Sequence, residues 1–300
     1  MTIMQIANPI YDVVFRYLLE DKKIAKLLIS SIIDEEIEDL DFSYNEFTSE
    51  SIAEKLKEKT ASAYSFTVYR LDFKAKIRTE EGYRIVLIEI QKAKFATDIM
   101  RFRTYLGSQY SDKENTQEVS IKGHPRKVGL PIISIYFLGH KLDHTEASVI
   151  HVRRDIRDLV TGEKIEKKES FIESLSHDSY IVQIPSLSQK RRNELETLLS
   201  IFDQSTAIDR EHHILSIREE SYPEKYHSLI RQLHKAIEEP EVRKKMDIED
   251  SILDEMTEQQ RRIETLSEKV EKERQAKEQA LKQNEALLQE IERLKKLMDH

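Results

Sequence analysis

Hydrophobic residues follow two different periods in the first half of the chain. Residues 8–33 carry leucine, isoleucine and valine at helical spacing, with a break near Asp21, which predicts a helical segment interrupted there. From Phe66 onward, apolar and polar residues alternate through "FTVYRLDFKAKI", which predicts a strand with one apolar face. The short stretch "RTEEGY" contains Gly82 and suits a hairpin turn. "RIVLIEIQ" is then apolar on both faces, as expected for a central strand.

The same periods predict further elements toward the middle of the chain. Residues 97–113 have apolar positions at steps of three and four, which indicates an amphipathic helix. "LPIISIYFLGH" and "SYIVQIP" predict two more strands, whereas the acidic "DEEIEDLDFSYNEF" is interpreted as a surface connection. Residues 141–170 give no clear assignment. From about 187 to 247 the pattern is helical, punctuated by Pro223 and Pro240, so we expect an α/β core with a helical annex.

The tail carries a seven-residue repeat over six repeats, almost without a helix breaker. Such a register predicts a coiled coil. Asn284 falls at a seam position, where asparagine favours a parallel pair, and we expect a homodimer through residues 256–298. A single charged helix, stabilised by pairs such as Glu268 with Lys272, is the alternative. Seam position a is Met256, Ile263, Val270, Lys277, Asn284, Ile291 and Met298, and position d is Gln259, Leu266, Glu273, Ala280, Leu287 and Leu294.

From these patterns we divide the 300 residues into an α/β domain at 1–185, a helical annex at 186–248 and a coiled-coil tail at 249–300.

Charge and composition restrict the possible classes of protein. The net charge of -8 means that any contact with DNA needs a local basic surface. The absence of cysteine excludes disulfides and thiolate metal sites. No apolar run approaches the ~20 residues needed to cross a bilayer, and no signal peptide is recognisable, so we expect a cytoplasmic protein without membrane contact.

Two acids interrupt the strand pattern. Alternation sets Asp72 apart from its apolar neighbours, and Glu89 and Gln91 share one face of the next strand. If the two strands pair as a hairpin, Asp72 and Glu89 can converge on one surface of the sheet. Neighbouring carboxylates repel each other unless a cation lies between them, and Mg²⁺ or Mn²⁺ binds oxygen ligands of this kind. A cation held there can polarise a phosphate oxygen, which is the basis of phosphodiester hydrolysis.

Each of these residues also has a plainer interpretation. Asp72 and Glu89 could be surface acids paired with Lys74, Arg70 or Lys92. The basic cluster after the acids could hold a DNA backbone or simply form a solvated helix face. His140 and His144 have the spacing H-x3-H but no suitable acid beside them, so a zinc site is not favoured. The basic cluster consists of Lys92, Lys94, Arg101 and Arg103.

The block "LDFKAKIRTEEGYRIVLIEIQKAK" resembles the core of the PD-(D/E)XK nuclease superfamily. Its Rpn branch, the recombination-promoting nucleases or PD-(D/E)XK nuclease family transposases, has a lone Asp on one strand and E-x-Q on the next, matched by Asp72 and by Glu89 to Gln91. An upstream helix with D-x-x-F is matched by Asp12 to Phe15, and a later helix with arginine and tyrosine by "MRFRTYLGSQY". The likeness covers roughly residues 8–140 and implies a restriction-endonuclease-like mixed sheet flanked by helices.

The resemblance also implies an activity and its residues. It implies an Mg²⁺-dependent (or Mn²⁺-dependent) DNA endonuclease with Asp72 and Glu89 as metal ligands and Asp12 as a possible third. Gln91 would take the position of a catalytic lysine. Glutamine supplies only a dipole to a developing phosphorane charge, where lysine supplies a full charge. Asp12 alternatively acts as a favourable charge at a helix N-terminus.

Two functional hypotheses of different classes therefore remain open. The first is a metal-dependent DNA endonuclease linked to recombination or transposition, working as a dimer that addresses both strands of a duplex. The second is a catalytically inactive nuclease-fold module that binds DNA or protein and oligomerises through its coiled coil, and the missing lysine favours it. A purely structural coiled-coil adaptor is a third, weaker possibility.

Overall fold

The computed structural model describes residues 3–42, 68–79, 82–93, 99–121, 124–167, 169–187 and 191–298. Within these ranges the backbone of Asp72 and Glu89 is described and their side chains are not. The chain forms two compact units, Met1–Glu249 and Asp250–His300. The domain boundaries predicted at 185/186 and 248/249 stay predictions.

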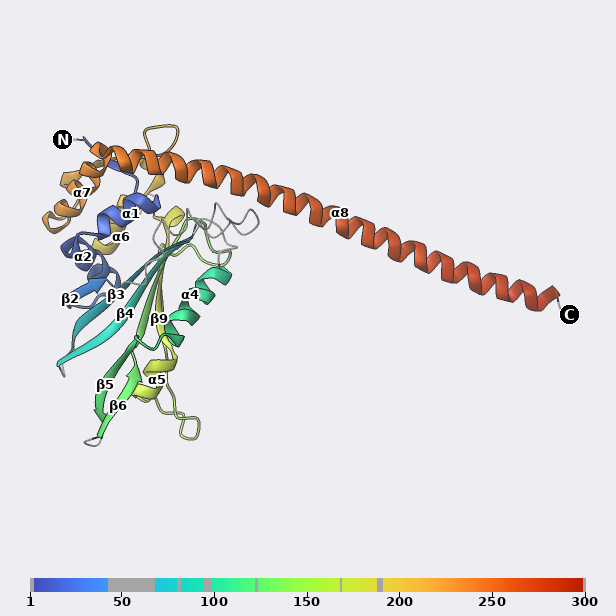
Figure 1. The fold of residues 1–300 in the computed structure, drawn as a ribbon, viewed down its shortest axis with the longest axis horizontal. Coiled ribbons are helices and arrows are strands. Elements are labelled where there is room, and N and C mark those ends of the chain that lie inside the picture. Colours follow the sequence, from blue (N-terminus) through green and yellow to red (C-terminus); the bar gives the residue numbers. More distant parts are fainter. Residues whose placement is uncertain are drawn as a thin grey trace. The chain divides into compact units, whose positions relative to one another are not determined.

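A six-stranded mixed sheet organises the first unit (Figure 1). Its first three strands are antiparallel, the third to fifth are parallel, and the last is again antiparallel. The mixed α/β class expected from the sequence is thereby confirmed, whereas its assignment to the PD-(D/E)XK fold stays a prediction. In spatial order the strands are β2 (Ile37–Phe42), β3 (Val68–Thr79), β4 (Gly82–Ala93), β7 (Ile132–Leu138), β9 (His177–Gln183) and β8 (Val149–Val152).

Strands β3 and β4 form the predicted hairpin, with Thr79 opposite Gly82 at its closed end. Phe73, Ala75 and Ile77 are fully buried, whereas Lys76 and Arg78 between and after them are exposed. The strand with one apolar face that the period-two pattern predicts is therefore confirmed: one face of β3 enters the core and the other carries polar residues. We call these the core face and the polar face of the sheet.

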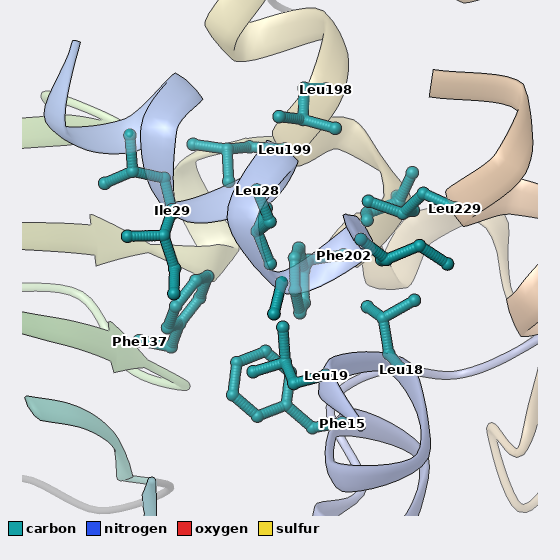
Figure 2. Close-up of a cluster of buried hydrophobic side chains, with 14 of the residues drawn as sticks. Phe15, Leu18, Leu19, Leu28, Ile29, Phe137, Leu198, Leu199, Phe202 and Leu229 are labelled. Carbon is teal, nitrogen blue, oxygen red and sulfur yellow. The ribbon is translucent and has the colours of Figure 1, made fainter. Parts of the chain in front are cut away.

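Helices from distant parts of the chain cover the core face (Figure 1). Two N-terminal helices are separated at Asp21, as the sequence predicts, because its carboxylate accepts hydrogen bonds from the second helix's first turn, at 2.8 Å from the backbone nitrogen of Lys23. In the core, Phe15, Phe137 and Phe202 meet edge to face or tilted (Figure 2). The helices are α1 (Asp12–Leu19), α2 (Lys22–Ile33), α6 (Glu194–Leu199) and α7 (His227–Glu238), with the 3-10 helix η3 (Ser200–Phe202).

The predicted amphipathic helix at 97–113 is confirmed as α4 (Ile99–Ser111) and packs on the polar face. Phe102 lies against Tyr136 with ring centroids 4.9 Å apart, in a small cluster with Leu138. The separate two-stranded sheet of β5 (Thr116–Ile121) and β6 (His124–Gly129) contacts α5 (Ser170–Leu175) through β6.

Two sequence interpretations are wrong. The acidic stretch read as a surface connection contains edge strand β2, whose Asp39 and Asp41 are register partners of lysines on β3. The supposedly helical annex contains β10 (Ile214–Arg218), which pairs with β1 (Ile3–Ala7) from the other end of the chain. Besides the helices α6 and α7, the described part of this annex contains the 3-10 helices η3, η4 (Gln204–Thr206), η5 (Glu219–Ser221) and η6 (Glu224–Tyr226), and η2 (Ile184–Ser186) lies at its start.

The long helix α8 (Pro240–Met298) begins in the first unit, where Val242 and Met246 enter the core, and makes up the second. The helical character predicted for the tail is confirmed, and its pairing into a coiled coil stays a prediction. Several seam residues are described on this single helix, and all of them are about half exposed or more: Ile263, Leu266, Val270, Leu287 and Ile291.

Candidate functional site

The two predicted acids are direct partners in the sheet. In the antiparallel register of β3 with β4, Asp72 lies opposite Glu89. Because opposite residues of an antiparallel pair share one face, and because Phe73 is on the core face, both acids belong to the polar face. The hairpin pairing predicted from the sequence is confirmed, and the convergence of the two carboxylates on a cation stays a prediction.

The same rung continues across the parallel strands. Glu89 is the register partner of Ser134 on β7, and Ser134 is the register partner of Ser179 on β9. We call residues 72, 89, 134 and 179 the acid–serine rung. It crosses four strands, so two acids and two hydroxyl residues lie side by side in the middle of the sheet.

The two serines form a buried hydrogen-bonded pair. Ser134 is fully buried and Ser179 is 9% exposed, and their Oγ atoms are 2.8 Å apart. The sequence did not single out either residue. The signal was present, because Ser134 interrupts the otherwise apolar strand "IISIYFL", and a hydroxyl inside a buried strand needs a partner.

The remaining predicted residues of the hairpin can be placed by register alone. Gln91 shares the polar face with Glu89 and lies opposite Arg70, so a cationic residue occupies the adjacent position. Lys92 falls at the position of Phe137, on the core-face parity. The side chains of Asp72, Glu89, Gln91, Lys92 and Arg101 lie outside the described residues, as does the whole of Lys94.

Asp12 opens helix α1 on the core face, whereas residues 72 and 89 share the polar face. Residue Tyr11 at the N-cap makes no side-chain capping bond. Instead the carboxylate of Glu249 accepts hydrogen bonds from the backbone N–H groups of Asp12 and Val13, each at 2.8 Å. The register therefore does not by itself bring Asp12 to the acid–serine rung, and its role as a third ligand stays a prediction.

Helix α4 adjoins the rung on the polar face. Its Phe102 packs on Tyr136, two residues beyond Ser134, and its Arg103 is exposed to solvent. Near its other end, the Tyr110 hydroxyl lies 2.8 Å from Nδ1 of His177, two residues before Ser179. Burial lowers the pKa of His177, as does the nearby charge of Arg154. Burial and the charge of Arg154 therefore both favour the neutral form of the His177 imidazole.

A partly buried ion-pair cluster fixes the start of strand β9. Arg154 binds Asp178 through Nε and Nη2, at 3.0 Å each, and Glu173 through Nη1 at 3.1 Å. Burial alone would raise the pKa of Asp178, but the hydrogen bonds and charge of Arg154 lower it overall. Fork geometry of this kind is stiff, so the strand that carries Ser179 is held firmly at its first residues.

The rung offers the donor atoms that a hard divalent cation prefers. Two carboxylate residues face each other across one strand pair, and Mg²⁺ or Mn²⁺ favours such oxygen ligands. Among the side chains that the structure describes, no group of three acidic, histidine or cysteine residues could hold a metal ion, and the side chains of Asp72 and Glu89 are outside that set. The residues present thus fit a site of one or two protein carboxylates completed by water and phosphate.

Comparison with protein-family models, with curated proteins and with solved structures gives no match for this chain. The resemblance to the Rpn nucleases therefore rests on the motif residues alone. Within the described part of the chain, no helix is both long and apolar enough to cross a lipid bilayer.

Proposed function

We propose that the chain is a divalent-metal-dependent DNA endonuclease that acts in recombination or transposition. The observation that carries the proposal is the register of the β3–β4 hairpin, which sets Asp72 directly opposite Glu89. The motif "LDFKAKI…RIVLIEIQ" supplies the nuclease-like context.

In this proposal Asp72 and Glu89 hold Mg²⁺ or Mn²⁺ on the polar face of the sheet. A cation bound there would polarise a phosphodiester and lower the pKa of water close to it. Gln91, on the same face, orients the attacking water or the phosphate through its amide dipole. Exposed Arg103 on α4, with Lys94 and Arg101, contacts the DNA backbone, which gives affinity without sequence preference, whereas the core-face parity of Lys92 does not support the DNA contact expected of it.

The proposal is tested by plasmid cleavage with Mg²⁺, beside an EDTA control and isosteric variants of the two acids. Asp72→Asn and Glu89→Gln each keep the size of the side chain and remove its charge. We expect both to lower the cleavage rate by at least about 100-fold, because a ligand charge at the cation is lost.

Asp41→Asn provides a matched control. Asp41 lies on neighbouring strand β2, is exposed, and pairs with Lys22. Its variant removes one acid from the same sheet without touching the rung, and we expect wild-type cleavage from it. Cleavage that persists in EDTA, or that survives in Asp72→Asn, would exclude metal-dependent hydrolysis at this site.

A catalytically inactive binding module is the second candidate, and Gln91 favours it. A lysine at this position would supply a full positive charge to the phosphorane-like transition state. If the wild-type chain leaves plasmid intact but shifts its mobility in a gel, while Gln91→Lys gains cleavage, the inactive module is the better description. Wild-type cleavage that needs Asp72 would instead reject it.

The proposed nuclease works in the cytoplasm as a homodimer through residues 256–298. Half-exposed apolar residues along α8 support pairing, because apolar side chains at heptad spacing gain most by burial against a second helix. Two copies of a single-cut site can then address both strands of a DNA duplex.

A further inference from the structure

The two serine hydroxyls of the acid–serine rung carry two donor hydrogens, and the hydrogen bond between them uses one of these hydrogens. Each hydroxyl carries a single donor hydrogen, and one hydrogen bond joins the Ser134 and Ser179 oxygens at 2.8 Å. One hydroxyl hydrogen is therefore left to point elsewhere. A buried donor needs an acceptor, because leaving it unsatisfied is costly.

The register identifies the adjacent acceptor. Ser134 has two register partners, Ser179 on β9 and Glu89 on β4. If Ser179 donates to Ser134, the free hydrogen is that of Ser134, on the same face and in the same rung as Glu89. A carboxylate is a stronger acceptor than a neutral oxygen, since hydrogen bonds to charged groups are shorter and stronger than those between neutral groups.

We propose that Ser134 is a positioning residue that donates a hydrogen bond to the Glu89 carboxylate, with Ser179 donating in turn to Ser134. The inference rests on the proposed function, because Glu89 is a metal ligand only there. Hydrogen bonds from outer groups orient ligating carboxylates, and their loss typically lowers metal affinity about 10- to 100-fold. The buried pair would in this way orient the Glu89 carboxylate.

Manganese binding by the full chain, without DNA, tests the proposal independently of cleavage. Isothermal titration with MnCl₂ gives the dissociation constant, and thermal unfolding checks that each variant is folded. We expect Ser134→Ala to raise the dissociation constant about 10- to 100-fold. Ser179→Ala should raise it less, because Ser134 keeps its own hydrogen. Ser134→Cys preserves the side-chain volume with a weak donor and should lie between wild type and Ser134→Ala.

Ser200→Ala is the matched control. Ser200 is equally buried, and its hydroxyl lies 2.9 Å from the Tyr222 hydroxyl, away from the rung. This variant loses a buried hydroxyl pair and should keep the wild-type affinity for Mn²⁺. If Ser134→Ala and Ser134→Cys both bind Mn²⁺ within about twofold of wild type while Asp72→Asn does not, the positioning role is rejected and the metal site stands. If wild type and Asp72→Asn bind Mn²⁺ alike, the metal site itself fails and the positioning role falls with it.

Discussion

Glu196 is the described carboxylate whose environment changes its pKa most clearly. It is buried at the start of α6, where it accepts hydrogen bonds from the backbone and guanidinium of Arg192 and, at 2.7 Å, from the hydroxyl of Ser148. The hydrogen bonds of Arg192 come first among the causes that lower its pKa from 4.5 to about 2. Asn193 caps the same helix by accepting the backbone N–H of Glu196.

We expect the stability of the fold to depend on this group in acid. The pKa is lowered in the folded state, so the contribution of Glu196 is complete above pH 4.5 and is lost as the pH falls toward about 2. Glu196→Gln should lower the free energy of unfolding at pH 7 by about 2 kcal/mol and flatten its decline below pH 4.5. Urea unfolding at pH 7 and pH 3 measures both effects.

Glu166→Gln is the control for this prediction. Glu166 pairs with Lys164 at 3.1 Å on the surface and is largely exposed, and surface pairs contribute little. If Glu166→Gln and Glu196→Gln lower the free energy of unfolding equally at pH 7, the assigned role of Glu196 is contradicted.

Strand alternation in the sequence predicts which residues of the candidate site share a face within one strand, but not which residues of different strands are neighbours. Alternation separated Asp72 from Phe73 and grouped Glu89 with Gln91 within each strand, because the side-chain period of a strand is two. It could not show that Glu89 lies beside Ser134 and that Ser134 lies beside Ser179. That requires the register between parallel strands far apart in the chain, which no local pattern encodes.

At the scale of elements, the N-terminus of α1 depends on a residue 237 positions away. Tyr11 at the N-cap has no capping bond, and the carboxylate of Glu249 supplies the acceptor for two backbone N–H groups. Negative charge at a helix N-terminus also interacts favourably with the helix dipole.

We therefore expect Glu249→Ala to lower the free energy of unfolding by about 1–2 kcal/mol. Glu249→Gln, which keeps one acceptor but no charge, should lower it by less. Chemical denaturation of the full chain measures these changes. For comparison, Glu258→Ala removes an exposed glutamate that pairs with Arg262 one turn away. We expect this variant to lower the free energy of unfolding by at most about 0.5 kcal/mol. A Glu249→Ala variant as stable as Glu258→Ala would show that the cap is unimportant.

Elements with one strong period were predicted correctly, and those with a weak or long-range signal were missed. The hairpin, α4, β7 and β9 each have a clear period and a buried face. Strand β2 was missed because its acids form ion pairs with distant lysines, Asp41 with Lys22 of α2 and Glu38 with Lys76 of β3, so the stretch looks like a loop in isolation. Strands β1 and β10 are short and pair across more than 200 residues, so neither has a local partner to reveal it.

At the scale of the whole molecule, the second unit exposes apolar residues at seam positions of its repeat. Helix α8 leaves Leu266 59% and Leu287 61% exposed, both at seam positions of the repeat. The middle of the seam is polar, with Lys277 and Asn284 at position a. We therefore expect pairing to be strongest toward the two ends of the seam and to favour a parallel dimer, since an asparagine at this position selects that arrangement.

The prediction for the whole molecule is a dimer whose stability depends on the seam. Light scattering of the full chain should give about twice the 35.4 kDa of one copy. Val270→Asp together with Leu287→Asp should give monomers at the same concentration, because each places a charge where an apolar contact is required. Gln275→Asp is the matched control: it puts the same poor helix former at an outward position, where the Gln275 amide donates a hydrogen bond to Glu271 of its own helix. If the seam variants remain dimeric, or the control also dissociates, the apolar seam is not what joins two copies, and residues 256–298 act as a solvated helix held by its own ion pairs.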